Sequence, residues 1–415
     1  MLNKNNFYFI GIGGIGMSAL ARLLLSRDKN VSGSDSAESK VTDGLVQEGV
    51  KINFEQVSEN ISDDVECVIY TLAIPDDNPE LVTAREKGIP TFLYSEMLGK
   101  ISENMKTIAV SGTHGKTTTT AMISDCLRAS EINPYTIVGS LMAESGTNYL
   151  EGDTDLFLVE ACEYKKSFLN LSPEILVITN IEEDHLDFYK DLEDIQNTFL
   201  ELAEKTSGKI ICNPNDKNLA PVVDMFLDKI VDYTKYIDKV PELNVLGKHN
   251  ILNSAAALAV SDILDADLDK SKQALSVFKG TWRRLEYKGE NENGAILYDD
   301  YAHHPSEIKS GLESLKEKFS NKKVSVIFQP HLYSRTKEFF DDFVKVLQIA
   351  DKVYVLPIYA AREKNNSSIN SEMILEKITD GTYLKDFNEA KEIVKVATSE
   401  DVVVTMGAGD IDQVI

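Results

Sequence analysis

Short apolar runs alternate along this chain with longer stretches in which apolar positions recur at helical spacing. At the amino terminus, residues 7–10 predict a strand, the glycine-rich segment 11–16 a turn, and residues 17–26 a helix. Helical stretches separate three further expected strands, at 30–32, 67–70 and 91–93. Residues 1–104 therefore predict a small doubly wound α/β unit.

The same alternation restarts at residue 105 and again near residue 281. In the second stretch the expected parallel strands are 107–110, 156–159, 175–178 and 209–212. In the third, helices such as 307–319 and 337–349 separate strands at 295–298, 324–328, 353–356 and 402–406. The sequence thus predicts an α/β protein of three domains in series, with bounds 1–104, 105–280 and 281–415.

Composition and charge exclude several classes of protein. Of the 415 residues, 43% are hydrophobic and 27% are charged, which is typical of a folded globular chain and not of a disordered one. Lys and Arg number 43 against 67 Asp and Glu, so the formal net charge is −24 and no basic field attracts nucleic acid or an anionic membrane. We therefore expect no nucleic-acid partner, and any anionic ligand must be bound by local donors.

Cysteine spacing and the amino-terminal segment both favour a cytoplasmic protein. The four cysteines show no CxxC spacing, which argues against a disulfide framework or a zinc site. A signal peptide is an alternative interpretation of Lys4, the apolar stretch after it and the Ala-Leu-Ala triplet at 19–21. Glycines interrupt that stretch at the spacings of a GxGxxG pattern, which favours a turn in a folded domain. No apolar segment is long enough to cross a bilayer. We expect no membrane insertion, and the oligomeric state stays open.

A glycine motif lies between the first strand and the first helix. Gly11, Gly13 and Gly16 form a GxGxxG pattern, which permits a tight turn and lets a diphosphate approach the N–H groups that begin the helix. Asp35 follows the second strand at the distance along the chain where a carboxylate meets a ribose hydroxyl. The motif indicates NAD or a UDP-sugar, and glycines needed only for helix–strand packing are a third interpretation.

A second and more specific glycine loop opens the central domain at Gly112-Thr113-His114-Gly115-Lys116-Thr117. A phosphate cradle needs glycines that expose backbone donors, a lysine to neutralise the β- and γ-phosphates, and a hydroxyl for Mg²⁺, and all are present here. The strict Walker spacing requires glycine where this chain has Val110, so the loop is a shortened variant. The loop predicts ATP and Mg²⁺ as cofactors.

Acidic and histidine residues follow two more strands of the central domain. Glu163 follows the strand at 156–159 and His185 follows the strand at 175–178, so both lie at the sheet edge where α/β proteins bind ligands. A carboxylate and a neutral imidazole can ligate a divalent ion, so both are candidates for the metal site. Each alone is more often a solvated loop residue, but the neighbouring phosphate loop favours the metal.

Two further residues have a functional and a structural interpretation. Asn250 precedes a small-residue helix at 254–260, where its amide can read an adenine edge or simply cap the helix. Arg284 opens the third domain, where it can reach a transferring phosphoryl group or form a surface ion pair.

Two polar clusters, residues 298–305 and 329–336, follow successive strands of the third domain. The paired His303 and His304 beside aspartates would suit a zinc hydrolase, but no HExxH or comparable ligand set accompanies them. Polar clusters at successive strand ends instead favour a wall that faces a substrate.

Together these motifs resemble those of the Mur ligases. The similar segments are Gly-Ile-Gly-Gly-Ile-Gly-Met-Ser at 11–18, Ser-Gly-Thr-His-Gly-Lys-Thr-Thr-Thr-Thr at 111–120, Asn-Ile-Glu-Glu-Asp-His-Leu-Asp at 180–187, His-Asn-Ile-Leu-Asn at 249–253, Tyr-Asp-Asp-Tyr-Ala-His-His-Pro at 298–305 and Met-Gly-Ala-Gly-Asp-Ile at 406–411. They follow the family order over nearly the whole chain.

The resemblance implies an N-terminal Rossmann-like domain for a UDP-sugar, a central P-loop ATPase domain with a mainly parallel sheet, and a C-terminal Rossmann-like domain that closes on both. The most similar members join L-alanine to UDP-N-acetylmuramate in peptidoglycan precursor synthesis, through an acyl phosphate formed with ATP. A sibling that attaches a preformed peptide to the same sugar is the nearest alternative. A nicotinamide-dependent dehydrogenase would use the first glycine loop alone.

Position by position, the resemblance implies a role for each motif residue. Residues expected at ATP are Gly112, Thr113, His114, Gly115, Lys116, Thr117, Thr118, Asn250 at adenine, Arg284 at the γ-phosphate and Asp300 at the ribose. Residues expected at the UDP-sugar are Gly11, Gly13, Gly14, Ile15, Gly16, Asp35, Thr71, Asn148, His331 and Arg335. Residues expected to organise Mg²⁺ are Thr117, Glu163 and His185. Residues expected to act in catalysis are Lys116, Glu163, His185, Arg284, His303 and His304, and either of the last two can take the proton of the alanine amine.

Three positions depart from the family pattern. Cys162 and Tyr164 flank Glu163 where many members have Ala-Asp-Glu-Ser, so the glutamate is kept while its neighbours change. Leu332 stands where arginine is often found, which leaves more of the carboxylate neutralisation to Arg335. Thr71 replaces a serine of the usual Ser-Ser-Ala-Ile, which changes one contact expected on the sugar side.

Overall fold

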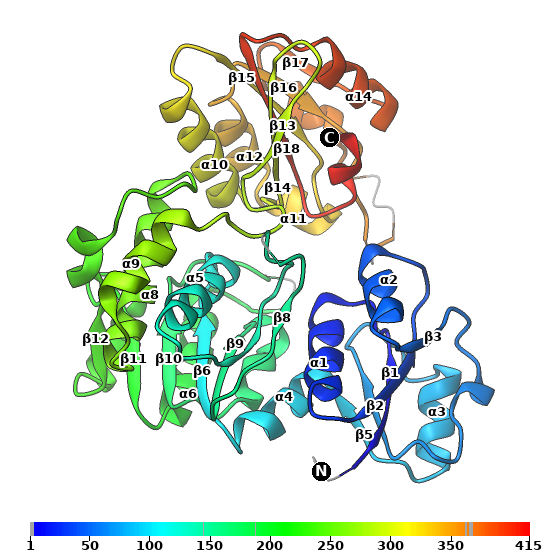
Figure 1. The fold of residues 1–415 in the computed structure, drawn as a ribbon. Helices are drawn as coiled ribbons and strands as arrows, with labels where there is room; N and C mark the ends of the chain where they lie inside the picture. Colours follow the sequence, from blue (N-terminus) through cyan, green and yellow to red (C-terminus); the bar gives the residue numbers. More distant parts are fainter. Residues whose placement is uncertain (1–3, 144, 187, 362, 365–367) are drawn as a thin grey trace. The chain divides into compact units, whose positions relative to one another are not determined.

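The computed structural model of the chain describes residues 4–143, 145–186, 188–361, 363–364 and 368–415 (Figure 1). The chain forms two compact units. The first comprises the residues up to Glu242 together with Leu252–Phe278, and the second comprises Leu243–Ile251 and Lys279–Ile415. Two β-sheets belong to the first unit and one to the second.

The amino-terminal sheet has five parallel strands in the order β3-β2-β1-β4-β5. These strands are β1 (Asn6–Ile10), β2 (Asn30–Ser34), β3 (Lys51–Asn53), β4 (Cys67–Tyr70) and β5 (Thr91–Leu93), and the helices are α1 (Ile15–Leu25), α2 (Lys40–Gln47), α3 (Pro79–Glu86) and α4 (Tyr94–Ser102). Residues 7–10 of β1 are buried because both faces of a parallel sheet are covered, which explains their unbroken apolar run. Since β1 lies between β2 and β4, the glycine loop after β1 opens where the strand order reverses.

The central sheet has the order β12-β11-β10-β6-β9-β7-β8, and only the short β7–β8 pair in the described chain is antiparallel within it. Its strands are β6 (Lys106–Ser111), β7 (Tyr135–Ile137), β8 (Tyr149–Leu150), β9 (Leu156–Glu160), β10 (Ile175–Ile178), β11 (Lys209–Cys212) and β12 (Ile230–Asp232). The helices that follow are α5 (Lys116–Ala129), α6 (Leu192–Lys205), α7 (Ala220–Met225), α8 (Lys248–Ile263) and α9 (Leu268–Val277). Because β6 lies between β10 and β9, the loops after these three strands meet at one edge.

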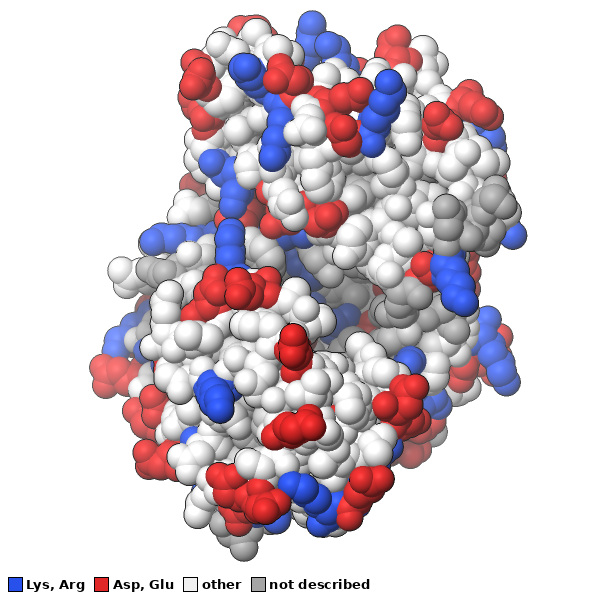
Figure 2. Space-filling view, turned by 90° about the vertical axis from the view of Figure 1, so that its right-hand side faces the viewer, with Lys and Arg blue, Asp and Glu red and all other residues white. Residues whose placement is uncertain are grey.

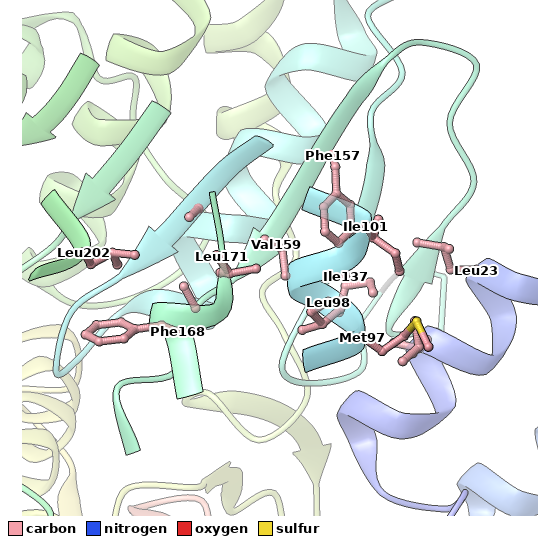
Figure 3. Packing of buried hydrophobic residues seen from close by; sticks show 14 of the residues in the cluster. Leu23, Met97, Leu98, Ile101, Ile137, Phe157, Val159, Phe168, Leu171 and Leu202 are labelled. Atoms are coloured by element: carbon pink, nitrogen blue, oxygen red, sulfur yellow. The ribbon is translucent and has the colours of Figure 1, made fainter. Parts of the chain in front are cut away.

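Helix α4 joins the two sheets of the first unit through one apolar core. Met97, Leu98 and Ile101 of α4 are at most 5% exposed. Figure 3 shows them between Leu23 of α1 and the central strands that carry Ile137, Phe157 and Val159. One cluster of buried side chains thus spans both sheets, which explains why they form a single compact unit.

The sheet of the second unit has the order β13-β14-β18-β15-β16-β17, with β13 antiparallel and the other strands parallel. Its strands are β13 (Glu286–Glu290), β14 (Ile296–Asp300), β15 (Lys323–Phe328), β16 (Lys352–Val355), β17 (Gly381–Tyr383) and β18 (Asp401–Met406). The helices are α10 (Pro305–Lys318), α11 (Tyr333–Glu338), α12 (Phe340–Leu347), α13 (Ser371–Leu375) and α14 (Phe387–Val396).

The predicted α/β class, with three mainly parallel sheets in series, is confirmed. The helix predicted over 337–349 is instead two helices, α11 and α12, because Phe339 leaves the helical conformation at φ −98° and ψ 25°. The short antiparallel strands β8 and β13 had no clear signal in the sequence. The domain bounds at 104 and 280 stay a prediction, since the first unit holds two sheets.

Figure 2 shows how the charged side chains are distributed on one face of the molecule. On the face in Figure 2, Asp and Glu side chains are interspersed with Lys and Arg. Among the described residues, no helix is both long and apolar enough to cross a bilayer.

Candidate active site

The loop between β6 and α5 has a backbone that favours glycine at two positions. Gly112 has φ 130° and Gly115 has φ 82°, conformations that side-chain-bearing residues rarely adopt. A Cβ added to Gly112 would lie 2.0 Å from Thr179 Oγ1, and one added to Gly115 would lie 2.7 Å from Asn253 Oδ1. The two glycines therefore make room for the tight loop that leads from β6 into α5.

Hydrogen bonds to the segment after β10 hold this loop in place. Thr113 N donates to Asn180 O at 3.0 Å, and His114 N donates to Asn180 Oδ1 at 2.9 Å. Thr179 Oγ1 returns a hydrogen bond of 2.6 Å to His114 O. The protein itself therefore orders the cradle. Asp187, the last residue of the 180–187 motif, lies outside the described residues.

Lys116 folds back over the loop that precedes it. Its Nζ donates to Gly112 O at 2.5 Å and to Thr113 O at 3.0 Å, and it lies 3.0 Å from Glu163 Oε2. Burial alone would lower the pKa of Lys116, but the carboxylate of Glu163 raises it above its ordinary value. The cradle thus contains a permanent positive charge held against loop carbonyls.

Glu163 and His185 complete a cluster around that charge. Glu163 is 3% exposed, and its Oε2 accepts no hydrogen bond although the ammonium group lies beside it. His185 Nε2 lies 3.8 Å from Glu163 Oε1, and the ring of Tyr164 lies 4.7 Å from the His185 ring. His185 has φ 55°, a strained conformation that recurs at functional sites. The structure thus brings together Lys116, Glu163 and His185, as the sequence predicts.

Thr117 contacts a residue that the sequence-based site did not include. Its Oγ1 donates to Glu160 Oε1 at 3.1 Å, and Gly139 N donates to Glu160 Oε2 at 2.7 Å. Two oxygen ligands of one Mg²⁺, each at about 2.1 Å, lie about 3 Å apart, so the spacing of Thr117 and Glu160 fits the ion. The signal was available, because Glu160 ends a buried strand beside the phosphate loop. Thr118, also expected at ATP, is buried in the first turn of α5.

The amino-terminal glycine loop is held by a carboxylate instead of a lysine. Gly11 has φ 83°, and Gly13 N donates to Asp35 Oδ2 at 2.7 Å. Gly16 lies against Tyr94, whose ring is 2.6 Å from where a Cβ would stand. Gly14 is the N-cap of α1 and has no side chain that could accept a hydrogen bond. The first N–H groups of the helix, from Ile15 onward, therefore have no side-chain cap.

Thr71 and Asn148, also expected at the sugar nucleotide, occupy different environments. Thr71 follows β4, and its Cγ2 would lie 3.5 Å from a Cβ added to Gly11. Thr71 therefore lies beside the glycine loop. Asn148 is fully buried behind the loop, where its amide hydrogen-bonds to α1.

Asp300 ends β14 in the second unit. It is 7% exposed, and its Oδ1 accepts from Ala302 N at 3.2 Å. Burial raises the pKa of Asp300 to about 7, against the opposing effect of Arg284 and with the support of Glu307. Arg284 lies 3.5 Å from Glu307 and over the ring of Tyr301. Asp300 and Arg284, both expected at ATP, therefore share one part of this unit.

Arg283, next to the predicted Arg284, has a structural role that the sequence did not reveal. It is 3% exposed, and its Nε donates to Asp299 Oδ2 at 2.9 Å. Its terminal nitrogens donate to Gly407 O at 2.6 Å and to Gly409 O at 2.7 Å. Arg283 thus fixes the glycine-containing loop after β18, while its neighbour is left more accessible.

Two histidines of the second unit, His303 and His331, belong to one aromatic group. The rings of His303 and His331 lie 5.9 Å apart, and His331 stacks on Tyr359 at 5.7 Å. Arg335 is buried beside His331, with 3.4 Å between Arg335 Nη1 and His331 Nδ1. His304 is the N-cap of α10 and hydrogen-bonds through Nδ1 to Ser306.

The roles of two further positions remain predictions. Leu332 is buried, and its backbone has φ 69° and ψ 137°. Its apolar side chain supplies no charge at the position where arginine is often found. Asn250 donates its amide to Leu246 O at 2.6 Å, which accounts for part of its hydrogen bonding within the second unit.

Models of known families match this arrangement in the same order. Residues 6–106 match the Mur ligase family catalytic domain, residues 110–238 the Mur ligase middle domain, and residues 283–409 the Mur ligase glutamate ligase domain. The chain belongs to the Mur ligase family. The family resemblance seen in the motifs is thereby confirmed.

Individual Mur ligases are similar over their full length. The UDP-N-acetylmuramate–L-alanine ligase of Caldicellulosiruptor bescii is 42% identical over an alignment that covers 99% of this chain and 97% of the relative. Among solved structures, the UDP-N-acetylmuramate-alanine ligase MurC of Thermotoga maritima matches with a TM-score of 0.82 and 29% identity, over 99% of this chain and 97% of that one. A murein peptide ligase of Psychrobacter arcticus shares the fold, with a TM-score of 0.72 and 20% identity over 99% and 97% of the two chains.

Proposed function

We propose that this chain is a UDP-N-acetylmuramate–L-alanine ligase, which joins the amine of L-alanine to the carboxylate of UDP-N-acetylmuramate and cleaves ATP to ADP and phosphate. The observation that carries the proposal is the Lys116 ammonium, held inside a glycine loop beside Glu163 and His185. The similarity to full-length relatives of that name supports the choice of substrates. Use of cytoplasmic ATP and alanine implies a cytoplasmic location.

The chemistry requires a nucleotide because a carboxylate is a poor electrophile at neutral pH. Its oxygen attacks the γ-phosphoryl group of ATP, which gives an acyl phosphate and ADP. The free amine of alanine then attacks the acyl carbon, the amide bond forms, and phosphate leaves from the tetrahedral intermediate as the amine loses a proton. The negative charge on the transferring oxygens must be stabilised, and Lys116 and Arg284 are the cations assigned to it.

The donor set of the central site fits a divalent cation. Thr117 and Glu160 supply paired oxygens 3.1 Å apart, and Glu163 supplies a buried carboxylate oxygen that accepts no hydrogen bond. Together with His185 these residues would hold Mg²⁺, which when bound neutralises phosphate charge.

The amino-terminal loop suits a diphosphate that carries no metal. Its contribution is a set of uncapped N–H groups at the start of α1, with Asp35 positioned by Gly13. In the second unit, His331 and Arg335 are assigned to the muramoyl carboxylate and alanine, and His303 or His304 to the amine proton. Asp300 and Asn250 are assigned to the ribose and adenine of ATP.

The decisive experiment measures phosphate release from ATP by the full chain. We expect turnover only when UDP-N-acetylmuramate and L-alanine are both present, and a panel with glycine and L-serine measures selectivity. Turnover with a preformed peptide in place of alanine would identify the sibling activity instead. Phosphate release that needs neither acceptor would contradict a ligase. Binding of NAD(H) in place of the sugar nucleotide would favour a dehydrogenase.

A further inference from the structure

Asn148 is a buried polar residue whose contacts cross from the central sheet to the helix that carries the amino-terminal glycine loop. It immediately precedes β8, and Val138 N donates to its backbone oxygen at 3.0 Å, which fixes it in the β7–β8 hairpin. Its side chain has no exposed surface. An amide in such a place is costly unless its hydrogen bonds are made within the protein.

All of the polar atoms of this amide are used within the first unit. Nδ2 donates to Ile15 O at 2.6 Å and to Ser18 Oγ at 2.8 Å. Oδ1 accepts from Arg22 Nη1 at 2.7 Å. Ser18 Oγ in turn donates to Ile15 O at 2.9 Å, so the carbonyl at the first position of α1 receives two hydrogen bonds.

The three partners of Asn148 share one face of α1. Ile15, Ser18 and Arg22 are separated by three and four residues, which places them one above another along the helix. Arg22 continues the network, because its Nε donates to both carboxylate oxygens of Glu48 at 2.8 and 2.9 Å, just after α2. Helix α1 is therefore tied through its first turn to the β7–β8 hairpin of the central sheet, and through Arg22, in its last turn, to the residue that follows α2.

We infer that Asn148 is a positioning residue for the sugar-nucleotide loop and acts on it through α1. The resemblance places Asn148 at the sugar nucleotide, but its two amide hydrogens and its oxygen bind Ile15, Ser18 and Arg22. Asn148 fixes the position and the direction of the first turn of α1, whose N–H groups would face the diphosphate. This role rests on the proposed function, because it assigns UDP-N-acetylmuramate to that loop.

The test compares binding of UDP-N-acetylmuramate and of ADP to the full chain by calorimetry. Asn148→Asp preserves the side-chain shape and the acceptor for Arg22, but removes both donors and sets a carboxylate against the Ile15 carbonyl. We expect the Kd for UDP-N-acetylmuramate to rise about tenfold, which corresponds to about 1.4 kcal/mol, while the Kd for ADP changes less than about twofold. Ser18→Ala is a milder change at the same turn and should raise the Kd for UDP-N-acetylmuramate about threefold.

Tyr149→Phe is the matched control. The Tyr149 hydroxyl hydrogen-bonds to Ser26 Oγ at 2.5 Å, so it joins the same hairpin to the opposite end of α1. Its loss should leave both dissociation constants unchanged. If Tyr149→Phe and Asn148→Asp weakened the binding of UDP-N-acetylmuramate equally, the inference would be overturned. General loosening of the contact between the hairpin and α1 would then explain both effects. Unchanged sugar-nucleotide affinity in folded Asn148→Asp, or in Ser18→Ala if the first variant does not fold, would also overturn it. A wild-type chain that does not bind UDP-N-acetylmuramate would contradict the proposed function itself.

Discussion

The first unit contains two glycine loops that occupy equivalent places and are built differently. Each follows a buried parallel strand next to the point where the strand order reverses, and each precedes a helix. The central loop holds Lys116, whose charge is stabilised by the buried Glu163. The amino-terminal loop instead has Asp35 on the N–H group of Gly13.

This difference shows how one local geometry serves two phosphate ligands. A triphosphate with a metal ion brings a large negative charge, which needs a cation and oxygen ligands beside the backbone donors. A diphosphate linked to a sugar can be held by backbone N–H groups alone, and a carboxylate nearby then suits a hydroxyl group. Each prediction below separates the two loops by changing one of these components.

The largest effect is expected from Lys116→Ala. Without the ammonium group the transferring phosphate loses its closest cation, so phosphate release that depends on alanine should fall by about a thousandfold or more. Binding of UDP-N-acetylmuramate should be retained. Lys106→Ala is the control, because Lys106 is an exposed lysine at the other end of β6, paired at 3.4 Å with the exposed Asp155. Retained turnover in Lys116→Ala would reject the assignment of the central loop.

A smaller effect is expected from Thr117→Val, which removes the hydroxyl that pairs with Glu160. The Mg²⁺ concentration needed for half-maximal binding of ADP should rise about thirtyfold, because one oxygen ligand is lost from the site. Thr117→Ser keeps the hydroxyl and should behave like the wild type. A titration of ADP binding against Mg²⁺ measures both variants. The same Mg²⁺ dependence in Thr117→Val and Thr117→Ser would remove Thr117 from the metal site.

At the amino-terminal loop, Gly13→Ala should raise the Kd for UDP-N-acetylmuramate about tenfold. Its Cβ would stand 2.9 Å from Asp35 Oδ2 and 2.8 Å from Thr42 Cγ2, so the carboxylate must move. The Kd for ADP is the control and should not change, because ADP is assigned to the other loop. Calorimetric titrations with the sugar nucleotide and with ADP distinguish the loops. An unchanged Kd for UDP-N-acetylmuramate in folded Gly13→Ala would argue against a ligand beside Gly13.

The smallest effect concerns Asp300, a buried carboxyl group of the second unit that contrasts with the lysine-paired Glu163. Because burial raises the pKa of Asp300 to about 7, the folded state holds a proton that the unfolded state releases at lower pH. The contribution of this group to stability is therefore complete below about pH 4, falls as the pH rises from there, and is gone once the pH has passed 7. The last part of this loss, between pH 6 and pH 8, is about 1 kcal/mol.

Asp300→Asn should remove this part of the pH dependence, because the amide does not titrate. Urea unfolding of wild type and variant at pH 6 and pH 8 gives the comparison. The variant should lose less stability than the wild type over this interval. Parallel pH dependence in the two proteins would show that Asp300 titrates at its ordinary pKa in the folded state.

Much of the fold was accessible from the sequence because its signals are local. Strands such as β4, β10 and β11 have the predicted bounds, since buried parallel strands are continuous apolar runs with polar or glycine-rich ends. The helix predicted over 337–349 failed at Phe339, because the apolar spacing continues through a break in the backbone. The two-residue β8 is too short to give a periodic pattern.

The candidate site also has a part that the sequence predicts and a part that it does not. The sequence predicts Lys116, Glu163 and His185 because each follows a strand, and parallel strands bring their carboxyl ends to one edge. Glu160 has the same signal, because it also ends a strand, but only the tertiary structure shows that its carboxylate faces Thr117. Arg283 and Arg284 are adjacent in the sequence, and only their surroundings separate a buried clamp from a more accessible side chain.

The sequence alone determined where this protein has glycine loops, which strands are buried and which residues carry charge beside them, because backbone freedom and hydrophobic periodicity are properties of short segments. Tertiary structure alone decided which side chains meet. Placing β6 between β10 and β9 joins Thr117 to Glu160, 43 residues away, and packing of the β7–β8 hairpin on α1 joins Asn148 to Arg22, 126 residues away. Such partners depend on strand order and on burial, which no short stretch of sequence encodes.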